Sequence, residues 1–291
     1  MKKALIIGGN RFFGKRLAKK LVNAGDFSVT LLNRGNREDD LGNEISRIKC
    51  DRDKQEQFAD SLSSDNWDVV YDQTCYDYDQ AKFSSELFNG RCKKYIFTSS
   101  QSVYPLGENL AEEIFSPESF RFKKKVSKEE NYAEAKRQAE YSFHTYSKMP
   151  LILVRFPIVF GTDDYTERLL FHIERIREAK DIYIPNPTAR LSLIDSDSAA
   201  ETLFQLAYHH DITGPINAAL KDPLSISEII QEIEKIVEEK CVFSKIKKDE
   251  NHSPYGLEDD WILNLERLNK LKLQIPDTKT ALRKTLAELL G

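Results

Sequence analysis

Short apolar runs alternate with longer segments whose apolar residues recur every three or four positions through the first half of the chain. Such runs are typical of buried strands, and the three-to-four spacing is typical of amphipathic helices. In the first helix-like segment Phe13, Leu17 and Leu21 share one face, and Gly25 follows where a helix would end. The pattern predicts strands at residues 4–7, 28–32, 46–50, 67–71, 94–98 and 151–156.

Repeated strand-helix-strand units with near-continuous apolar strands predict an α/β fold, a Rossmann-like doubly wound parallel sheet with helices on both faces. After residue 160 the pattern changes to a smaller, mainly helical part, with a short strand at 191–194. We expect helices there at 166–180, up to about 208, at 227–239 and at 279–290. The domains predicted are 1–160, with a return segment near 188–210, and 161–291.

The bulk composition is that of an ordinary folded protein: 291 residues, 40% hydrophobic and 31% charged. The 43 Lys and Arg against 47 Asp and Glu give a net charge of -4, so no global positive field attracts nucleic acid or anionic lipid. Four widely spaced cysteines indicate reduced thiols and no metal site. With no long apolar window and no signal-like N-terminus, we expect a cytoplasmic protein without a membrane segment.

The stretch "ALIIGGNRFFG" at residues 4–14 combines a predicted strand, a glycine-rich turn and the start of a helix. In this context Gly8, Gly9 and Gly14 allow the backbone to approach a pyrophosphate, which the amides of a helix N-terminus would bind. The motif is imperfect, because Arg11 stands where a middle glycine is usual. The turn still predicts a dinucleotide-binding domain in the first 160 residues.

The second predicted strand ends in "LLNRG", without the carboxylate that would bind the ribose 2′-hydroxyl of NAD. Asn33 and Arg34 stand there instead, and a guanidinium is suited to a 2′-phosphate. The side chain of Arg11 could join Arg34 as a second clamp, or it could be solvated among neighbouring cations. The sequence therefore favours NADP over NAD. Asp51, after the third strand, is placed to face an adenine edge or to cap the next helix.

"NYAEAKRQAE" places Tyr132 and Lys136 four residues apart, on one face of a predicted helix. The preceding strand ends in the hydroxyl-rich "YIFTSSQSVYP", which includes Ser100. A tyrosine with a pKa of about 10 is a poor base, but a lysine ammonium and a cationic nicotinamide would stabilise its phenolate. These residues predict Tyr132 as acid and base, Lys136 as its partner, and Ser100 as the hydroxyl that orients the substrate.

Together these motifs make the chain resemble an extended short-chain dehydrogenase/reductase, of the family of nucleotide-sugar epimerases and dehydratases. Further matching segments follow in family order, namely "DVVYDQT", "VRFPIVFG", "RLSLID" and "GPINAAL" followed by "SISEII". Two departures stand out: Arg11 in the glycine turn, and "YDQTCYD" in place of a small apolar segment after the fourth strand. The second departure affects the shape of the nicotinamide side.

The resemblance implies that residues 156–158 line the nicotinamide and that Arg190 approaches the phosphates of the substrate. Together with the glycine turn and the strand ends, the candidate cofactor residues are Gly8, Gly9, Asn10, Arg11, Phe12, Phe13, Gly14, Asn33, Arg34, Asp51, Arg52, Gln73, Thr98, Tyr132, Lys136, Phe156, Pro157 and Ile158. The candidate substrate residues are Ser100, Gln101, Ser102 and Arg190.

The function expected is that of an NADP(H)-dependent oxidoreductase or epimerase. It would act on a hydroxyl or carbonyl of a small-molecule substrate such as a sugar nucleotide, and the smaller domain would bind that substrate. Resemblance to the family also suggests a homodimer through the helices after the fourth and fifth strands. Substrate identity and the choice among epimerisation, dehydration and reduction stay open.

A second class of function comes from the combination of "GGNRFFG" with "NRG". It is similar to a branch that includes the chloroplast stem-loop RNA-binding proteins. A non-catalytic RNA binder would use a local basic strip, and "RFKKKVSK" at residues 121–128 is the obvious one. The alternative is a solvated loop, which the net acidity favours. Retention of Ser100, Tyr132 and Lys136 together also favours chemistry over nucleic-acid binding.

Overall fold

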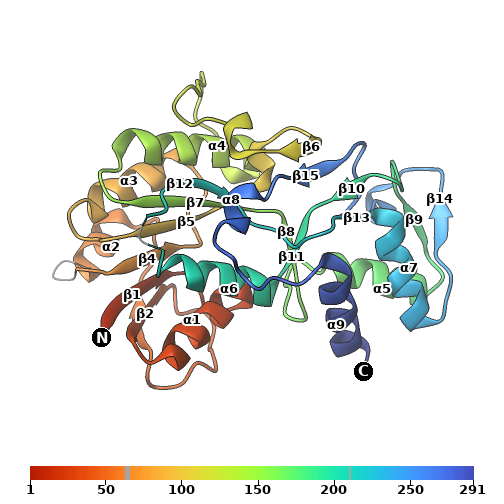
Figure 1. Ribbon diagram of the computed structural model, residues 1–291, viewed down its shortest axis with the longest axis horizontal. Coiled ribbons are helices and arrows are strands. Elements are labelled where there is room, and N and C mark those ends of the chain that lie inside the picture. The colour runs from red at the N-terminus through yellow and green to blue at the C-terminus, as the bar shows by residue number, and fades with distance from the viewer. Residues whose placement is uncertain (63–65, 210) are drawn as a thin grey trace.

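A seven-stranded parallel sheet forms the centre of the protein in a computed structural model, which describes residues 1–62, 66–209 and 211–291. The strand order is β12-β7-β5-β4-β1-β2-β3, and every pairing is parallel (Figure 1). This confirms the doubly wound fold. The strands are β1 (Lys2–Ile7), β2 (Phe27–Asn33), β3 (Ser46–Lys49), β4 (Val69–Asp72), β5 (Tyr95–Ser100), β7 (Leu151–Phe156) and β12 (Gly214–Asn217).

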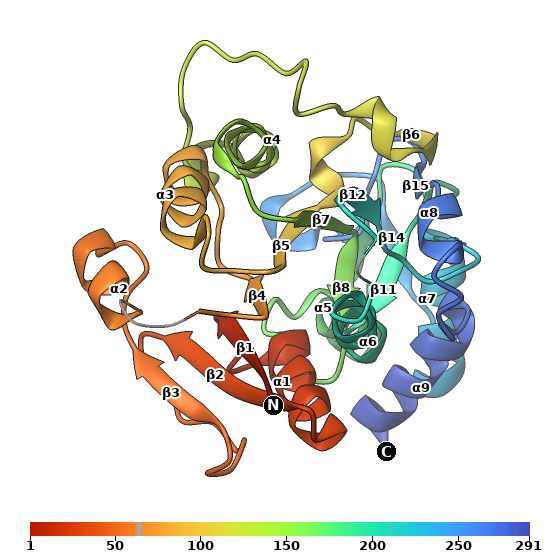
Figure 2. The same ribbon diagram turned by 60° about the vertical axis from the view of Figure 1, so that its left-hand side comes forward.

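Helices cover both faces of this sheet (Figure 2). One face carries α1 (Phe12–Ala24) and α6 (Ser196–Leu206), and the other carries α2 (Gln55–Ser61), α3 (Tyr78–Phe88) and α4 (Lys128–Tyr146). The apolar stripe of α1 is buried, and the helix ends at Gly25 in a left-handed conformation, as predicted. Helix α4 begins with a capping box between Ser127 and Glu130, which positions the segment that carries Tyr132.

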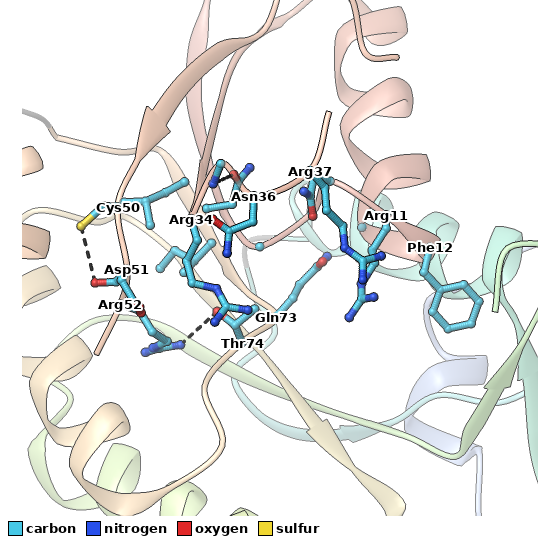
Figure 3. Close-up of a pocket in the computed structure, with 18 of the residues that line it drawn as sticks. Arg11, Phe12, Arg34, Asn36, Arg37, Cys50, Asp51, Arg52, Gln73 and Thr74 are labelled. Atoms are coloured by element: carbon cyan, nitrogen blue, oxygen red, sulfur yellow. Dashed lines mark hydrogen bonds between the residues drawn. The ribbon is translucent and has the colours of Figure 1, made fainter. Parts of the chain in front are cut away.

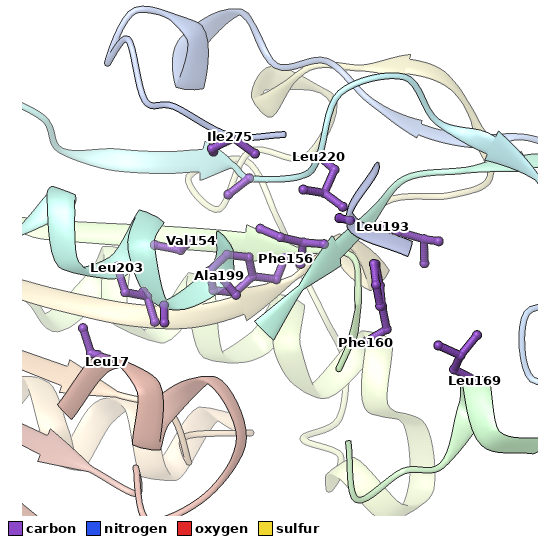
Figure 4. Packing of buried hydrophobic residues seen from close by; sticks show 14 of the residues in the cluster. Leu17, Val154, Phe156, Phe160, Leu169, Leu193, Ala199, Leu203, Leu220 and Ile275 are labelled. Atoms are coloured by element: carbon purple, nitrogen blue, oxygen red, sulfur yellow. The ribbon is translucent and has the colours of Figure 1, made fainter. Parts of the chain in front are cut away.

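Two apolar clusters lie on opposite faces of the sheet, and one of them continues into the C-terminal half. This larger cluster includes Leu17 from α1 and Leu203 from α6 and extends through Phe156 and Phe160 to Leu193 (Figure 4). The sheet and the C-terminal half therefore share one core.

The C-terminal half combines helices with short strands. The helices expected after residue 225 are present as α7 (Ile226–Val237) and α9 (Thr278–Leu290), but the short strands β14 (Val242–Ser244) and β15 (Trp261–Leu263) were not predicted. The expected strand at 191–194 is instead two strands in different sheets, separated by Ser192, whose backbone N–H donates to Trp261 and whose hydroxyl accepts from Leu263. Among the described residues, no helix has the length and apolarity to cross a lipid bilayer.

The remaining elements belong to this half, except β6, which comes from the N-terminal half. A small sheet has the order β13-β10-β15-β6, and two strand pairs are β11-β8 and β14-β9. The strands are β6 (Gly107–Leu110), β8 (Ile158–Phe160), β9 (Asp181–Tyr183), β10 (Arg190–Leu191), β11 (Leu193–Asp195), β13 (Leu224–Ser225), β14 (Val242–Ser244) and β15 (Trp261–Leu263). The α-helices are α5 (Arg168–Arg177), α7 (Ile226–Val237), α8 (Glu266–Asn269) and α9 (Thr278–Leu290).

Candidate functional site

The glycine turn between β1 and α1 is so tightly packed that its three glycine positions have no room for a side chain. Gly8 and Gly9 have φ of +100° and +81°, in the range that favours glycine. A Cβ on Gly9 would lie 2.6 Å from Cγ2 of Ile6, and one on Gly14 would lie 2.6 Å from Cα of Gly9. The backbone of this turn can therefore approach a ligand at the start of α1, where helix amides attract anions.

A pocket of about 360 Å³ opens in front of the turn (Figure 3). It lies at the carboxyl ends of the parallel strands, where doubly wound sheets bind their ligands. Its walls are formed by residues 7–14, 32–37 and 50–53, by Gln73, Thr74, Tyr76 and Gln80, and by Lys128 and Tyr165.

The arginines that line this pocket include Arg11, Arg34 and Arg37. Arg11 packs over the ring of Tyr165, with its guanidinium carbon 3.5 Å from the ring centre. In the described part of the chain none of the three forms an ion pair with a carboxylate. Unneutralised cations in one cavity attract an anion. Arg37 was not predicted as a site residue, and it reaches the pocket after a turn at Gly35 (φ +66°).

Arg52 also lines the pocket, but its charge is neutralised inside the protein. Its Nη1 donates to Oδ1 of Asp72 at 2.6 Å and its Nη2 donates to Ser84 at 2.9 Å. The hydroxyl of Tyr95 donates to the other carboxylate oxygen of Asp72. Burial would lower the pKa of Arg52, but the Asp72 carboxylate raises it above its usual value. Arg52 therefore supports the pocket floor through a buried ion pair, which distinguishes it from the three unpaired arginines.

Other predicted cofactor residues contribute polar atoms. Asp51 lines the pocket, and its carboxylate accepts the backbone N–H of Asp53 at 3.2 Å; the N-cap position of α2 belongs to Lys54. The Nε2 atom of Gln73 and the hydroxyl of Thr98 are buried without a hydrogen-bond partner. A ligand acceptor would satisfy the Gln73 amide, which belongs to the pocket lining.

The structure brings Ser100, Tyr132 and Lys136 together beside this edge of the sheet. Nζ of Lys136 donates to the backbone oxygens of Cys75, at 2.7 Å, and Thr98, at 2.9 Å. The lysine is only 2% exposed, and burial lowers its pKa to about 8. Thr98 lies within β5 and Cys75 follows β4, so the position of this ammonium is determined by the central sheet.

Tyr132 follows a kink in α4, because Asn131 has non-helical dihedral angles. The residue is 42% exposed, and the centre of its ring lies 5.9 Å from Nζ of Lys136. Burial raises the pKa of Tyr132, and a hydrogen bond with Ser100 opposes that rise. The Ser100 hydroxyl also accepts from the backbone and hydroxyl of Ser102. A protonated phenol and a polarised serine hydroxyl are thus held side by side.

The other predicted residues lie around these two groups. Asn10 and Phe13 line the pocket together with Phe12, which has φ of +53°. The ring of Phe156 packs against Phe13 at 5.8 Å. Of the described residues, those predicted to contact the nicotinamide or the substrate lie outside the pocket lining, namely Thr98, Ser100, Gln101, Ser102, Tyr132, Lys136, Phe156, Pro157, Ile158 and Arg190.

Two predicted substrate residues are engaged within the protein. Gln101 is buried and donates from Nε2 to the backbone oxygen of Trp261 at 2.8 Å. Arg190 is exposed, and its guanidinium forms ion pairs with Asp260, at 2.7 Å, and Glu108, at 3.2 Å. A substrate phosphate at Arg190 would therefore compete with two carboxylates.

Comparison with known proteins gives a consistent result. Residues 4–219 match the model of the NAD dependent epimerase/dehydratase family. Over 244 residues the chain is 27% identical to chloroplast stem-loop binding protein of 41 kDa b from Arabidopsis thaliana. That match covers 73% of this chain, which spans 60% of the length of the relative.

Similar solved structures include the UDP-glucuronic acid 4-epimerase of Bacillus cereus in complex with NAD, with 17% identity and a TM-score of 0.76 over 99% of this chain and 96% of the other. Another is the UDP-N-acetylglucosamine 4-epimerase of Methanobrevibacter ruminantium in complex with UDP-N-acetylmuramic acid. It has 20% identity and a TM-score of 0.72 over 98% and 97% of the two chains. At these identities the likeness shows a common fold.

Proposed function

Since this chain belongs to the NAD dependent epimerase/dehydratase family, we propose that it is an NADP(H)-dependent oxidoreductase or epimerase that acts on a hydroxyl or carbonyl of a sugar nucleotide. The observation that carries this proposal is the convergence of Ser100, Tyr132 and Lys136 beside the glycine-turn pocket. A nucleotide site and an acid-base group at one sheet edge provide what such an enzyme requires.

The pocket fits the adenosine half of a dinucleotide that carries a 2′-phosphate. Its glycine turn leaves the amides at the start of α1 available to a pyrophosphate, and no carboxylate stands at the end of β2 to bind a ribose 2′-hydroxyl. Arg34, Arg37 and Arg11 supply unpaired cations there, which favours NADP. The Bacillus cereus structure contains NAD, so the arginines carry the argument for NADP in this chain. When bound, the nicotinamide would accept or donate a hydride.

The catalytic side chains would hold the substrate oxygen and move its proton. With its pKa raised by burial, Tyr132 is protonated at neutral pH and can donate to a carbonyl oxygen. Lys136 is positively charged below its pKa of about 8. This charge would stabilise the phenolate that Tyr132 becomes when it donates its proton. Ser100 can donate a hydrogen bond to the same oxygen and orient it. In the reverse direction Tyr132 would take the proton from a hydroxyl.

We propose that the first 160 residues hold the cofactor and that residues 161–291 shape the substrate site. The similar solved structures are UDP-sugar epimerases, which suggests UDP-sugars as probes. Ser100, Gln101, Ser102 and Arg190 remain the proposed substrate contacts. Of these, Arg190 would exchange an ion pair with Asp260 for one with a phosphate.

A Tyr132→Phe variant tests this function. Removal of the hydroxyl should lower turnover roughly 100-fold or more, the scale of losing a general acid, while NADPH affinity stays within about twofold. Turnover would be measured with UDP-glucose, UDP-glucuronic acid and UDP-N-acetylglucosamine as separate probes.

The matched control is Tyr141→Phe, on the same helix but within an aromatic cluster with Tyr78 and Phe122. It should turn over substrate like the wild type. Equal losses in both variants, or undiminished turnover in Tyr132→Phe, would contradict the assignment.

RNA binding is the second candidate, because the relative from Arabidopsis is named a stem-loop binding protein. The geometry of the basic strip at 121–128 gives it less support. Arg121 donates to backbone oxygens of its own loop, Lys124 pairs with Glu130, and Lys125 pairs with Asp79. These cations are already partnered. Salt-sensitive binding of a stem-loop RNA, together with absence of NADPH binding, would reverse the ranking.

A further inference from the structure

Tyr76 lies between the nucleotide pocket and the catalytic side chains. It follows β4 within the segment "YDQTCYD", and it is part of the pocket lining. On its other side, its ring centre is 6.4 Å from that of Tyr132. Two ammonium groups lie over the ring, Lys128 at 4.0 Å and Lys136 at 4.8 Å from its centre. A half-buried aromatic ring thus separates the place where a nucleotide would bind from the place where chemistry would occur.

Behind this ring the ammonium group of Lys136 is enclosed. Nζ of Lys136 lies under three rings, those of Phe97 at 4.6 Å, Tyr76 at 4.8 Å and Tyr132 at 5.9 Å. The pocket lining ends at Tyr76, Lys128 and Tyr165, and it does not include Lys136 or Tyr132. The cavity therefore offers room beside the glycine turn but no open path to Lys136.

The way Tyr76 is held allows it to move. Its backbone N–H donates to Oε1 of Gln80 at 2.8 Å, which anchors the main chain. Its hydroxyl, in contrast, has no hydrogen-bond partner among the described residues. To leave its place the ring has to give up its contacts with two ammonium groups, but no hydrogen bond of its hydroxyl. A change of side-chain rotamer can therefore displace the ring without disturbing the loop.

We infer that Tyr76 is a positioning residue that controls whether the nicotinamide half of the cofactor reaches Tyr132 and Lys136. The pocket as it stands receives the adenosine half, on the glycine turn and the arginines. The Tyr76 ring must turn aside before the nicotinamide half can bind. The fraction of molecules in which the ring has turned aside therefore limits the affinity for the cofactor. This inference rests on the proposed function, because it assumes that NADP(H) is the ligand.

Two ligands allow binding to the two halves of the site to be measured separately. Adenosine 2′,5′-bisphosphate probes the adenosine half alone, and NADPH probes both halves; each is titrated by calorimetry into wild type, Tyr76→Ala and Tyr76→Phe. In the wild type we expect the two affinities to lie within about threefold. If the open state is populated to roughly one tenth, Tyr76→Ala should bind NADPH about tenfold more tightly, with unchanged bisphosphate affinity. Tyr76→Phe should bind both ligands with the wild-type affinities, because the ring and not the hydroxyl blocks the nicotinamide half.

The control is Tyr78→Ala, which removes a tyrosine from the neighbouring aromatic cluster, outside the nucleotide pocket. It should leave both affinities unchanged. Unchanged or weaker NADPH binding in Tyr76→Ala, with the bisphosphate still bound, would overturn the inference and leave the proposed function standing. Failure of the wild type to bind either ligand would instead reject the proposed cofactor, and the inference with it.

Discussion

Arg11, Arg34 and Arg37 illustrate what single residues contribute to this site. Their guanidinium groups line one pocket, and none has a carboxylate partner among the described residues, whereas Arg52 nearby forms an ion pair with Asp72. A bound anion would therefore gain charge-assisted hydrogen bonds from the first three without breaking existing ion pairs. Such bonds contribute about 1.5 to 3 kcal/mol each.

This predicts a cofactor preference. Wild-type protein should bind NADPH at least tenfold more tightly than NADH, and Arg34→Ala and Arg37→Ala should each weaken NADPH binding about tenfold while leaving NADH unaffected. Fluorescence titration of both cofactors measures the effect. Arg177→Ala, an exposed arginine on α5, serves as the control and should change neither affinity. Equal affinity of the wild type for NADPH and NADH would show that the arginines do not bind the 2′-phosphate, and would contradict the preference for NADP.

For single residues, the sequence predicted a place in the pocket where the residue directly follows a predicted strand. The position of Arg34 in the pocket could be predicted because it directly follows β2. Arg37 could not, because its place depends on the left-handed conformation at Gly35. The buried partner of Arg52 was also beyond sequence reasoning, since Asp72 is 20 residues away and meets it only through the parallel pairing of the sheet.

The element that matters most is the turn joining β1 to α1. Gly14 has ordinary helical dihedrals, so alanine would suit its backbone, and only packing requires glycine there. A Cβ would meet Cα of Gly9 at 2.6 Å and the side chain of Gln73. The helix is thereby held against the turn and against the segment after β4.

Gly14→Ala should therefore separate the turn from the helix. We expect a loss of about 1 to 3 kcal/mol in the free energy of unfolding, from overpacking, and at least a tenfold loss of NADPH affinity. Urea unfolding and calorimetric titration provide the two readouts. Gly25→Ala at the other end of α1 is the control: it has positive φ but open space, so it should cost about 1 kcal/mol and leave binding intact. Normal NADPH affinity in Gly14→Ala would show that the turn tolerates displacement.

Element prediction succeeded where strands were long and failed where they were short. The six predicted strands of the central sheet correspond to β1, β2, β3, β4, β5 and β7. Most of them are sustained apolar runs, whereas β3 is largely polar and lies at the edge of the sheet. Strands such as β10 and β13 have two residues each, which is too short to show an alternation of apolar and polar residues. They exist because tertiary contacts hold them, as where Ser192 bridges to Trp261.

At the scale of the whole molecule, the two halves share their apolar core. Phe156 at the end of β7 and Phe160 in β8 belong to the same cluster as Leu17 under the sheet and Leu286 in α9. The sequence suggested two domains, since the strand-helix alternation stops near residue 160. The physical continuity of the core was not visible in it, because contacts between residues far apart in sequence leave no periodic signal.

A shared core predicts cooperative unfolding, and the two tryptophans of the chain allow a direct test. Trp67 packs in the cluster on the α3 and α4 face of the sheet, whereas Trp261 packs in β15 beside Leu263. Tryptophan fluorescence of Trp261→Phe therefore reports on the sheet, and that of Trp67→Phe reports on the C-terminal half. In each variant, the urea midpoint from fluorescence should equal that from far-ultraviolet circular dichroism, because loss of either half exposes the apolar surface that the other needs. Two halves with separate cores would instead show a fluorescence midpoint displaced from the dichroism midpoint, in opposite directions for the two variants.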